Sequence, residues 1–244
     1  MTTVILFVFG VIIGSFLNVV GLRLNSGLSL GGRSHCNSCN KTLRWWELVP
    51  VLSFVVLGGR CSHCRAKINL QYPLVELWTG LVFVTIPLLF IPVFCLYIVI
   101  TIYDLRHKII PDVLVYWAIL LSLLVRCLLG GSLLDYLAGP ILFVFFGLVW
   151  LLSRGRAMGF GDAKLSLSIG LLLGAALGFS AVVLAFWVGA VVGLALILSQ
   201  RIYPLLRRAR TITMKSELPF APFLVLGVWL ALLLQIDLLH VSSF

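Results

Sequence analysis

This chain of 244 residues has only eight acidic side chains, so the position of each can be examined for chemistry. Four of them fall at the ends of apolar segments: Glu76, Asp104, Asp112 and Asp162. Ionisable groups at membrane depth are costly and are usually functional. Two carboxyl groups at equal depth could hydrolyse a peptide bond, because an ionised one can take a proton from water while a protonated one polarises the carbonyl.

Asp104 and Asp162 are the strongest candidates for such a pair. Asp104 interrupts an apolar segment, and Asp162 ends the motif Gly159-Phe160-Gly161-Asp162 directly before another. Two glycines allow a close backbone approach at that point, although Asp162 could also simply cap the helix. Asp112 follows a proline near a helix start, so capping explains it as well as catalysis does. Spacing alone does not establish that Asp104 and Asp162 meet.

The other ionisable groups have simpler interpretations. Asp135 and Asp237 fall near the outer ends of apolar segments, where solvation at the interface accounts for them. Glu47 belongs to a polar loop and could be solvated there or pair with a basic neighbour, and Glu76 could cap or pair with a neighbouring helix. Lys164 could tune the ionisation of Asp162, but reaching to the interface is the favoured interpretation.

Four of the six cysteines form two CxxC pairs in one long polar loop: Cys36, Cys39, Cys61 and Cys64. Four thiolates suit tetrahedral Zn²⁺. The loop is expected to be cytoplasmic, and the reducing conditions of the cytoplasm disfavour disulfides between these cysteines. A closed site of four sulfurs leaves no position for water, so the pattern predicts structural zinc. His35 and His63 could substitute as ligands, while unrelated thiols or a redox pair are weaker interpretations. Cys95 and Cys127 are predicted to be packing residues.

The elements that must position these groups are apolar. The chain is 61% hydrophobic and 11% charged, whereas soluble domains are about 45–50% apolar and about 25% charged, so lipid must cover most of the surface. The sequence predicts an all-α polytopic membrane protein with about eight transmembrane helices and a small cytoplasmic zinc-binding loop. The expected spans are roughly 3–22, 74–91, 93–103, 112–129, 134–152, 164–179, 181–199 and 218–237.

The basic residues predict the orientation of these spans. Seventeen of the 18 lysines and arginines lie in alternate connections, around 23–72, 104–111, 153–164 and 200–217, and only Arg126 lies near the opposite side. The positive-inside rule makes the basic side cytoplasmic and places both termini outside. The net charge of +10 therefore reflects topology. Nucleic-acid binding would need a basic patch on a soluble fold, and is excluded.

An ordered set of motifs along nearly the whole chain resembles one family. These motifs are Gly14-Ser-Phe-Leu-Asn18, Cys36-Asn-Ser-Cys39, Trp46-Glu47-Leu-Val-Pro50, Cys61-Ser-His-Cys64, Tyr72-Pro73-Leu-Val-Glu76, Asp104-Leu-Arg-His-Lys-Ile-Ile-Pro111-Asp112 and Gly159-Phe-Gly161-Asp162-Ala-Lys164. They resemble the bacterial type IV prepilin leader peptidases, aspartic proteases of the GxGD class.

The resemblance implies that Asp104 and Asp162 are the catalytic pair of an endopeptidase in the bacterial inner membrane. The substrates would be type IV prepilins or pseudopilins, cleaved after a basic leader at the cytoplasmic face. Many members also methylate the new N-terminal residue with S-adenosylmethionine, so a second activity is expected. The implied organisation is a first helix (1–24), a zinc-binding and methylation region (25–72) and a peptidase domain (73–244).

Four alternatives stay open at this point. The chain could be a peptidase without methylase activity. A presenilin-like or signal-peptide-peptidase-like GxGD protease would share the second aspartate but would not explain the cysteine loop. A transporter could use the carboxylates as a proton relay, although no inverted repeat supports it. A non-enzymatic assembly factor could use the loop to dock partners.

Overall fold

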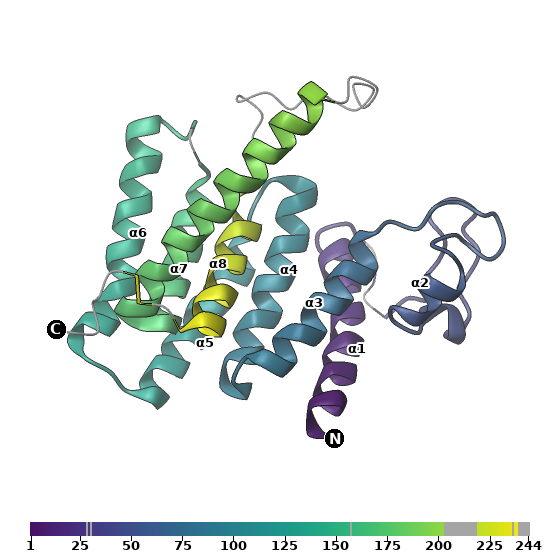
Figure 1. Ribbon diagram of the computed structural model, residues 1–244, viewed down its shortest axis with the longest axis horizontal. Coiled ribbons are helices and arrows are strands. Elements are labelled where there is room, and N and C mark those ends of the chain that lie inside the picture. The colour runs from purple at the N-terminus through teal and green to yellow at the C-terminus, as the bar shows by residue number, and fades with distance from the viewer. Residues whose placement is uncertain (28, 30, 157, 203–218, 236, 239–244) are drawn as a thin grey trace. The chain divides into compact units, whose positions relative to one another are not determined.

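The computed structural model describes every residue except 28, 30, 157, 203–218, 236 and 239–244. Its main helices (Figure 1) are α1 (Thr2–Arg23), α3 (Gln71–Thr85), α4 (Ile91–His107), α5 (Asp112–Leu129), α6 (Leu133–Ser153), α7 (Phe160–Ile202) and α8 (Ala221–Leu234). Short helices η1 (Trp45–Leu48), α2 (Leu52–Val56) and η2 (Leu88–Phe90) complete the set. The described residues contain no strand beyond two isolated bridges, which confirms the all-α prediction.

The predicted spans agree with the helices except at two boundaries. Five helices in the described part are long and apolar enough to cross a membrane. The break predicted between the spans 164–179 and 181–199 is misplaced: α7 runs through this point and is instead interrupted at Gly174, whose φ of 76° and ψ of −171° are not helical. The span predicted at 74–91 ends early, at Thr85, and η2 then leads into α4. Most of the last basic connection, residues 203–217, lies outside the described residues.

Two compact units divide the chain, residues 1–102 and 103–244. In the first unit α1 packs closely against α3. A Cβ atom added to Gly10 would lie 2.8 Å from Phe83, and one added to Gly14 would lie 2.8 Å from Thr79. Small residues let apolar helices approach closely in lipid, where van der Waals packing replaces the hydrophobic effect. The predicted boundaries near residues 24 and 72 stay a prediction.

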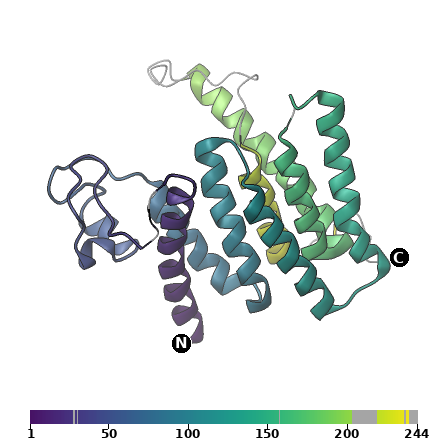
Figure 2. The ribbon, with the colours of Figure 1, turned by 180° about the vertical axis from the view of Figure 1, so that it is seen from behind.

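In the second unit α7 packs against α5, α6 and α8, and both views show α8 (yellow) beside α7 (green) (Figures 1 and 2). Gly139 and Gly170 allow the close crossing of α6 and α7, since a Cβ on Gly170 would lie 2.5 Å from the Gly139 nitrogen. Ser122 and Ser168 share a buried hydrogen bond of 2.9 Å between α5 and α7. The helix that begins beside Asp162 is therefore held by three neighbours.

Candidate active site and metal centre

Asp104 lies in the last turns of α4 and is only 4% exposed. Its Oδ2 accepts a 3.3 Å hydrogen bond from the backbone N–H of Ala221, the first residue of α8. The first amides of a helix lack partners within the helix and carry partial positive charge. Asp104 is thus joined to a helix start that lies 117 residues away in the sequence, a partnership that no local pattern indicates.

Asp162 lies in the first turn of α7 and is 6% exposed. Its backbone N–H donates to the Gly159 carbonyl over 3.2 Å. Its Oδ1 atom is buried and has no hydrogen-bond partner among the described residues. A buried polar atom without a partner is costly and is often found where a substrate or water binds. The carboxyl group also accepts a hydrogen bond from the Gly159 backbone, as a helix cap would, but capping does not account for the unpartnered Oδ1.

The fold brings the two aspartates together. Both belong to the unit formed by residues 103–244, and the Asp104 carboxyl group is close enough for its charge to act on Asp162. Two neighbouring carboxyl groups can provide a general base and a proton donor, which are the two roles that peptide hydrolysis needs.

The two glycines of the GxGD motif have different surroundings. A Cβ atom on Gly161 would lie 2.8 Å from the Cβ of Ile110, in the connection between α4 and α5. A Cβ on Gly159 would meet nothing closer than Asp162 Oδ2, at 3.7 Å. Gly161 is therefore required for the close packing of the segment that carries Asp162, while Gly159 has room for a methyl group.

Asp112 does not join the pair. It begins α5, is largely exposed, and forms a 2.8 Å ion pair with Lys164 of α7. The Lys164 ammonium also lies 5.3 Å from the ring centre of Phe160 and 5.6 Å from that of Tyr116. Lys164 thus bonds to a carboxylate on a neighbouring helix, which the prediction that it reaches to the interface missed.

The far end of the Asp162 helix holds a polar cluster that sequence reasoning also missed. Arg126 of α5 is buried and donates to the carbonyls of Leu171 and Leu172, each over 3.0 Å. Asp135 of α6 accepts a 3.0 Å hydrogen bond from the N–H of Ala175. Arg126 therefore caps the helix that ends before Gly174, and Asp135 caps the one that follows. The simpler reading of Asp135 as a solvated interfacial group was incomplete.

In the other unit, the four cysteines of the loop converge. The sulfurs of Cys36, Cys39, Cys61 and Cys64 all lie within 4.8 Å of one another. The Sγ atoms of Cys36 and Cys64 are 3.7 Å apart, and four sulfurs bound to zinc at about 2.3 Å would be about 3.8 Å apart. Backbone N–H groups of Ser38 and then Cys39 lower the pKa of Cys36 to about 6, which favours the thiolate that binds metal. The donor set fits zinc.

Each CxxC pair sits in the same small turn. Cys36 N–H donates to Lys41 O, and Cys61 N–H donates to Ala66 O, over 3.0 and 2.9 Å. Asn40 and Arg65 each follow the second cysteine with positive φ, 53° and 58°. The two turns thus share the same hydrogen bond and the same positive φ, and each presents two sulfurs to the cluster. The backbone of His35 forms an isolated β-bridge with Thr42, and the cluster of possible metal ligands contains neither His35 nor His63.

Glu47 and Glu76 hold the cysteine loop together. Glu47 accepts hydrogen bonds from the Arg44 N–H, over 2.6 Å, and from the Ser62 hydroxyl beside the second cysteine pair. Glu76 of α3 accepts a 2.7 Å hydrogen bond from the Val51 N–H. Both glutamates are buried. They therefore connect parts of the loop to each other and to α3, and do not join the cysteine cluster.

Comparison with known proteins divides the chain in two. The family described as bacterial peptidase A24 N-terminal domain matches residues 8–90, which include the four cysteines. The type IV leader peptidase family matches residues 88–194, which include Asp104 and Asp162. No solved structure matched the chain.

Curated relatives cover nearly the whole chain. A prepilin leader peptidase/N-methyltransferase of Bacillus subtilis is 32% identical over 94% of this chain and 93% of its own length. A protein of the same name from Aeromonas hydrophila is 31% identical over 94% of this chain and 89% of its own length. The type 4 prepilin-like proteins leader peptide-processing enzyme of Escherichia coli O78:H11 is 34% identical over 68% of this chain and 74% of its own. This membrane-embedded, all-helical chain therefore belongs to the type IV leader peptidase family.

Proposed function

We propose that this protein is a membrane-embedded aspartic endopeptidase that removes the leader of type IV prepilins or pseudopilins. The observation that carries the proposal is the pair of buried carboxyl groups, Asp104 and Asp162, at neighbouring helix ends in one unit. The printed names of the relatives, which describe prepilin leader processing, support the substrate class. The names of the relatives describe leader processing, which favours a peptidase over a transporter or an assembly factor.

In the proposed mechanism the pair activates water against the scissile carbonyl. One aspartate, ionised, accepts a proton from the water, and the other, protonated, donates a hydrogen bond to the carbonyl oxygen. Asp162 Oδ1 has no partner among the described residues, so it is available for the water or the carbonyl. The Ala221 N–H bonded to Asp104 Oδ2 keeps that carboxyl group oriented while the proton moves.

Cleavage is proposed to occur at the cytoplasmic face of the bacterial inner membrane. Asp104 and Asp162 fall at the ends of helices that adjoin basic connections, and 17 of the 18 lysines and arginines are in connections on that side. Positively charged connections are retained in the cytoplasm. This orientation also places the cysteine loop in the cytoplasm and both termini outside.

We further propose that the protein methylates the new N-terminal amine with S-adenosylmethionine, as the N-methyltransferase part of the relatives' names suggests. Structural zinc held by the four cysteines would order the loop that precedes the peptidase region. A closed site of four sulfurs leaves no position for a substrate at the metal, so the zinc would shape the loop and take no direct part in either reaction.

The peptidase proposal is tested with purified protein and a prepilin in detergent, with leader loss followed by mass spectrometry. Asp104→Asn and Asp162→Asn should each abolish cleavage, because neither remaining carboxyl group can act as both base and acid. Asp112→Asn is the matched control, since this aspartate is largely exposed and paired with Lys164, and it should keep most of the activity. Full cleavage by both Asp104→Asn and Asp162→Asn would refute the pair mechanism.

The methylation proposal is tested in the same reaction. Isotopically labelled S-adenosylmethionine should transfer its methyl group to the mature pilin after cleavage. A substrate supplied already cleaved separates the two activities, because Asp162→Asn should still methylate it. A wild-type enzyme that cleaves but transfers no label would be a peptidase alone.

A further inference from the structure

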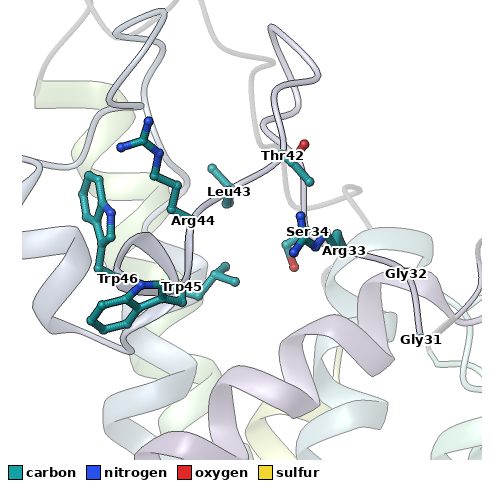
Figure 3. Close-up of a pocket in the computed structure, with 10 residues that line it drawn as sticks. Gly31, Gly32, Arg33, Ser34, Thr42, Leu43, Arg44, Trp45 and Trp46 are labelled. Carbon is teal, nitrogen blue, oxygen red and sulfur yellow. The ribbon is translucent and has the colours of Figure 1, made fainter.

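The cysteine loop contains an open cavity of about 820 Å³. Two segments of the loop line it, residues 31–34 and residues 42–46 together with Leu48. Figure 3 shows these segments facing each other, with Arg33 on one side and Trp45 on the other. A cavity of this size is within the range of small-molecule sites, about 300–1,000 Å³. Neither the zinc site nor the aspartate pair uses it.

The charge of the cavity indicates an anionic ligand. Arg33 and Arg44 are among its lining residues and no acidic side chain is. The segment 23–72 as a whole has seven lysines and arginines and one acid, Glu47. That glutamate is buried and accepts hydrogen bonds from the Arg44 N–H and the Ser62 hydroxyl. Its charge is therefore directed into the loop, and the surface of the loop is strongly cationic.

The methyl donor fits this cavity poorly. S-adenosylmethionine has a sulfonium, an ammonium and one carboxylate, so its net charge at neutral pH is positive. The cavity is lined by two arginines and by no acidic side chain, which disfavours a cation. A phosphate group, which guanidinium groups bind well, is a better match.

Exposed apolar side chains continue from the cavity along the chain. Trp45 lines the cavity and is 81% exposed. Leu52, Val55 and Val56 of α2 are 64%, 68% and 80% exposed. Exposed apolar groups gathered within one short segment mark an interaction surface. Tryptophan and aliphatic groups next to basic side chains are typical of segments that lie in the headgroup region of a bilayer.

The loop is also held at a membrane surface by its connections. It begins where α1 ends, at Arg23, and ends where α3 begins, at Gln71, and both helices are in the same unit. The loop is therefore tethered beside the bilayer, where anionic lipid headgroups are at a high effective concentration.

We propose that this cavity binds the phosphate of anionic phospholipid headgroups and docks the zinc loop onto the bilayer. Arg33 and Arg44 supply the positive charge that attracts the phosphate, while Trp45 and the exposed side chains of α2 enter the interface. The proposal does not depend on the peptidase or methylase activity. Docking would fix the height of the loop relative to a substrate emerging from the membrane.

The test uses the full-length protein in nanodiscs of phosphatidylcholine alone or mixed with phosphatidylglycerol. Hydrogen–deuterium exchange of residues 42–56 is the readout. We expect slower exchange in the anionic nanodiscs, with the difference lost at high salt. Arg33→Gln and Arg44→Gln should each reduce the protection roughly fivefold, as expected for removal of one basic group near an anionic surface. Zinc content verifies that each variant is folded.

The matched control is Arg60→Gln, which removes the same single charge from the same loop outside the cavity. This variant should retain most of the protection that phosphatidylglycerol gives. Equal protection in both lipids, or equal loss in the control, would overturn the proposal. Protection in neutral nanodiscs by inorganic phosphate or by S-adenosylmethionine would do the same, because it would assign the cavity to a soluble ligand.

Discussion

Gly161 lies so close to Ile110 that a Cβ atom on the glycine would be 2.8 Å from the Cβ of the isoleucine. Real Cβ atoms do not approach this closely, so the segment carrying Asp162 can pack here only as glycine. The two residues are 51 positions apart: Gly161 directly precedes Asp162, and Ile110 lies six residues after Asp104. It is thus one of the contacts that set the position of Asp162 in its unit.

The two glycines of the motif should differ in their tolerance of alanine. We expect Gly161→Ala to lose nearly all cleavage activity, since overpacking displaces backbone at a cost of about 1–3 kcal/mol. Gly159→Ala is the control, because its Cβ would make only ordinary contacts, at 3.7 Å or more, and it should retain most activity. The measurement is the cleavage rate of each variant at equal concentrations of folded protein, compared with the rate of the wild type. Equal loss in both would contradict the packing argument.

Substitution of Gly174 should destabilise the second unit. Its φ of 76° is costly for alanine, and a Cβ would lie 2.5 Å from Asp135 Oδ1 and 2.8 Å from Arg126 Nη2. We expect Gly174→Ala to lower the free energy of unfolding by about 2–4 kcal/mol, from backbone strain and the disturbed cluster together.

Gly147 in α6 provides the control for Gly174, since a Cβ there would meet nothing within 4 Å. Gly147→Ala should be neutral or slightly stabilising, by up to about 1 kcal/mol, because alanine favours helix. Thermal unfolding in detergent measures both variants. A stable Gly174→Ala protein would show that the break in α7 can move along the helix.

Glu47→Gln should weaken the cysteine loop in a pH-dependent way. The Arg44 N–H, then the Ser62 hydroxyl, hold the pKa of Glu47 below its ordinary value. The ionised form therefore stabilises the fold, fully above the ordinary glutamate pKa of about 4.3, and the contribution is lost as pH falls through the lowered pKa. We expect a loss of about 1 kcal/mol at pH near 7 in Glu47→Gln.

Unfolding of the loop, followed by tryptophan fluorescence across this pH range, measures the difference between wild type and Glu47→Gln. The two proteins should converge in acid. Ser62→Ala, which removes one of the two hydrogen bonds, should have a smaller effect. An unchanged difference at low pH would mean that the shape of the side chain matters and its charge does not.

Removal of one sulfur ligand should release zinc and unfold the loop. Cys36→Ser should lower the bound zinc and expose the loop to trypsin, because a small loop depends on its metal for folding. Cys127→Ser changes an exposed single thiol of α5 and should behave as wild type. Metal analysis with limited proteolysis gives the result, and zinc retained in Cys36→Ser at the wild-type level would refute the four-cysteine site.

Much of the fold could be predicted from the sequence because lipid imposes simple rules. Long apolar runs must be helical to satisfy their backbone groups, and each of the eight predicted spans overlaps a helix or a part of α7. The break in α7 was misplaced for a physical reason. The pair Gly178 and Ser180 indicates a turn locally, but Arg126 and Asp135 stabilise the interruption at Gly174 from two other helices.

The sequence by itself determined the chemistry that this protein can hold: two CxxC pairs suited to zinc, and two aspartates on the basic side of apolar helices. Only the tertiary structure decided which groups are partners. It brought Asp104 to the first amide of α8 and close to Asp162. It also placed Asp112 where it forms an ion pair with Lys164. These contacts join residues dozens of positions apart, where packing of whole helices sets the distances and local sequence preferences do not.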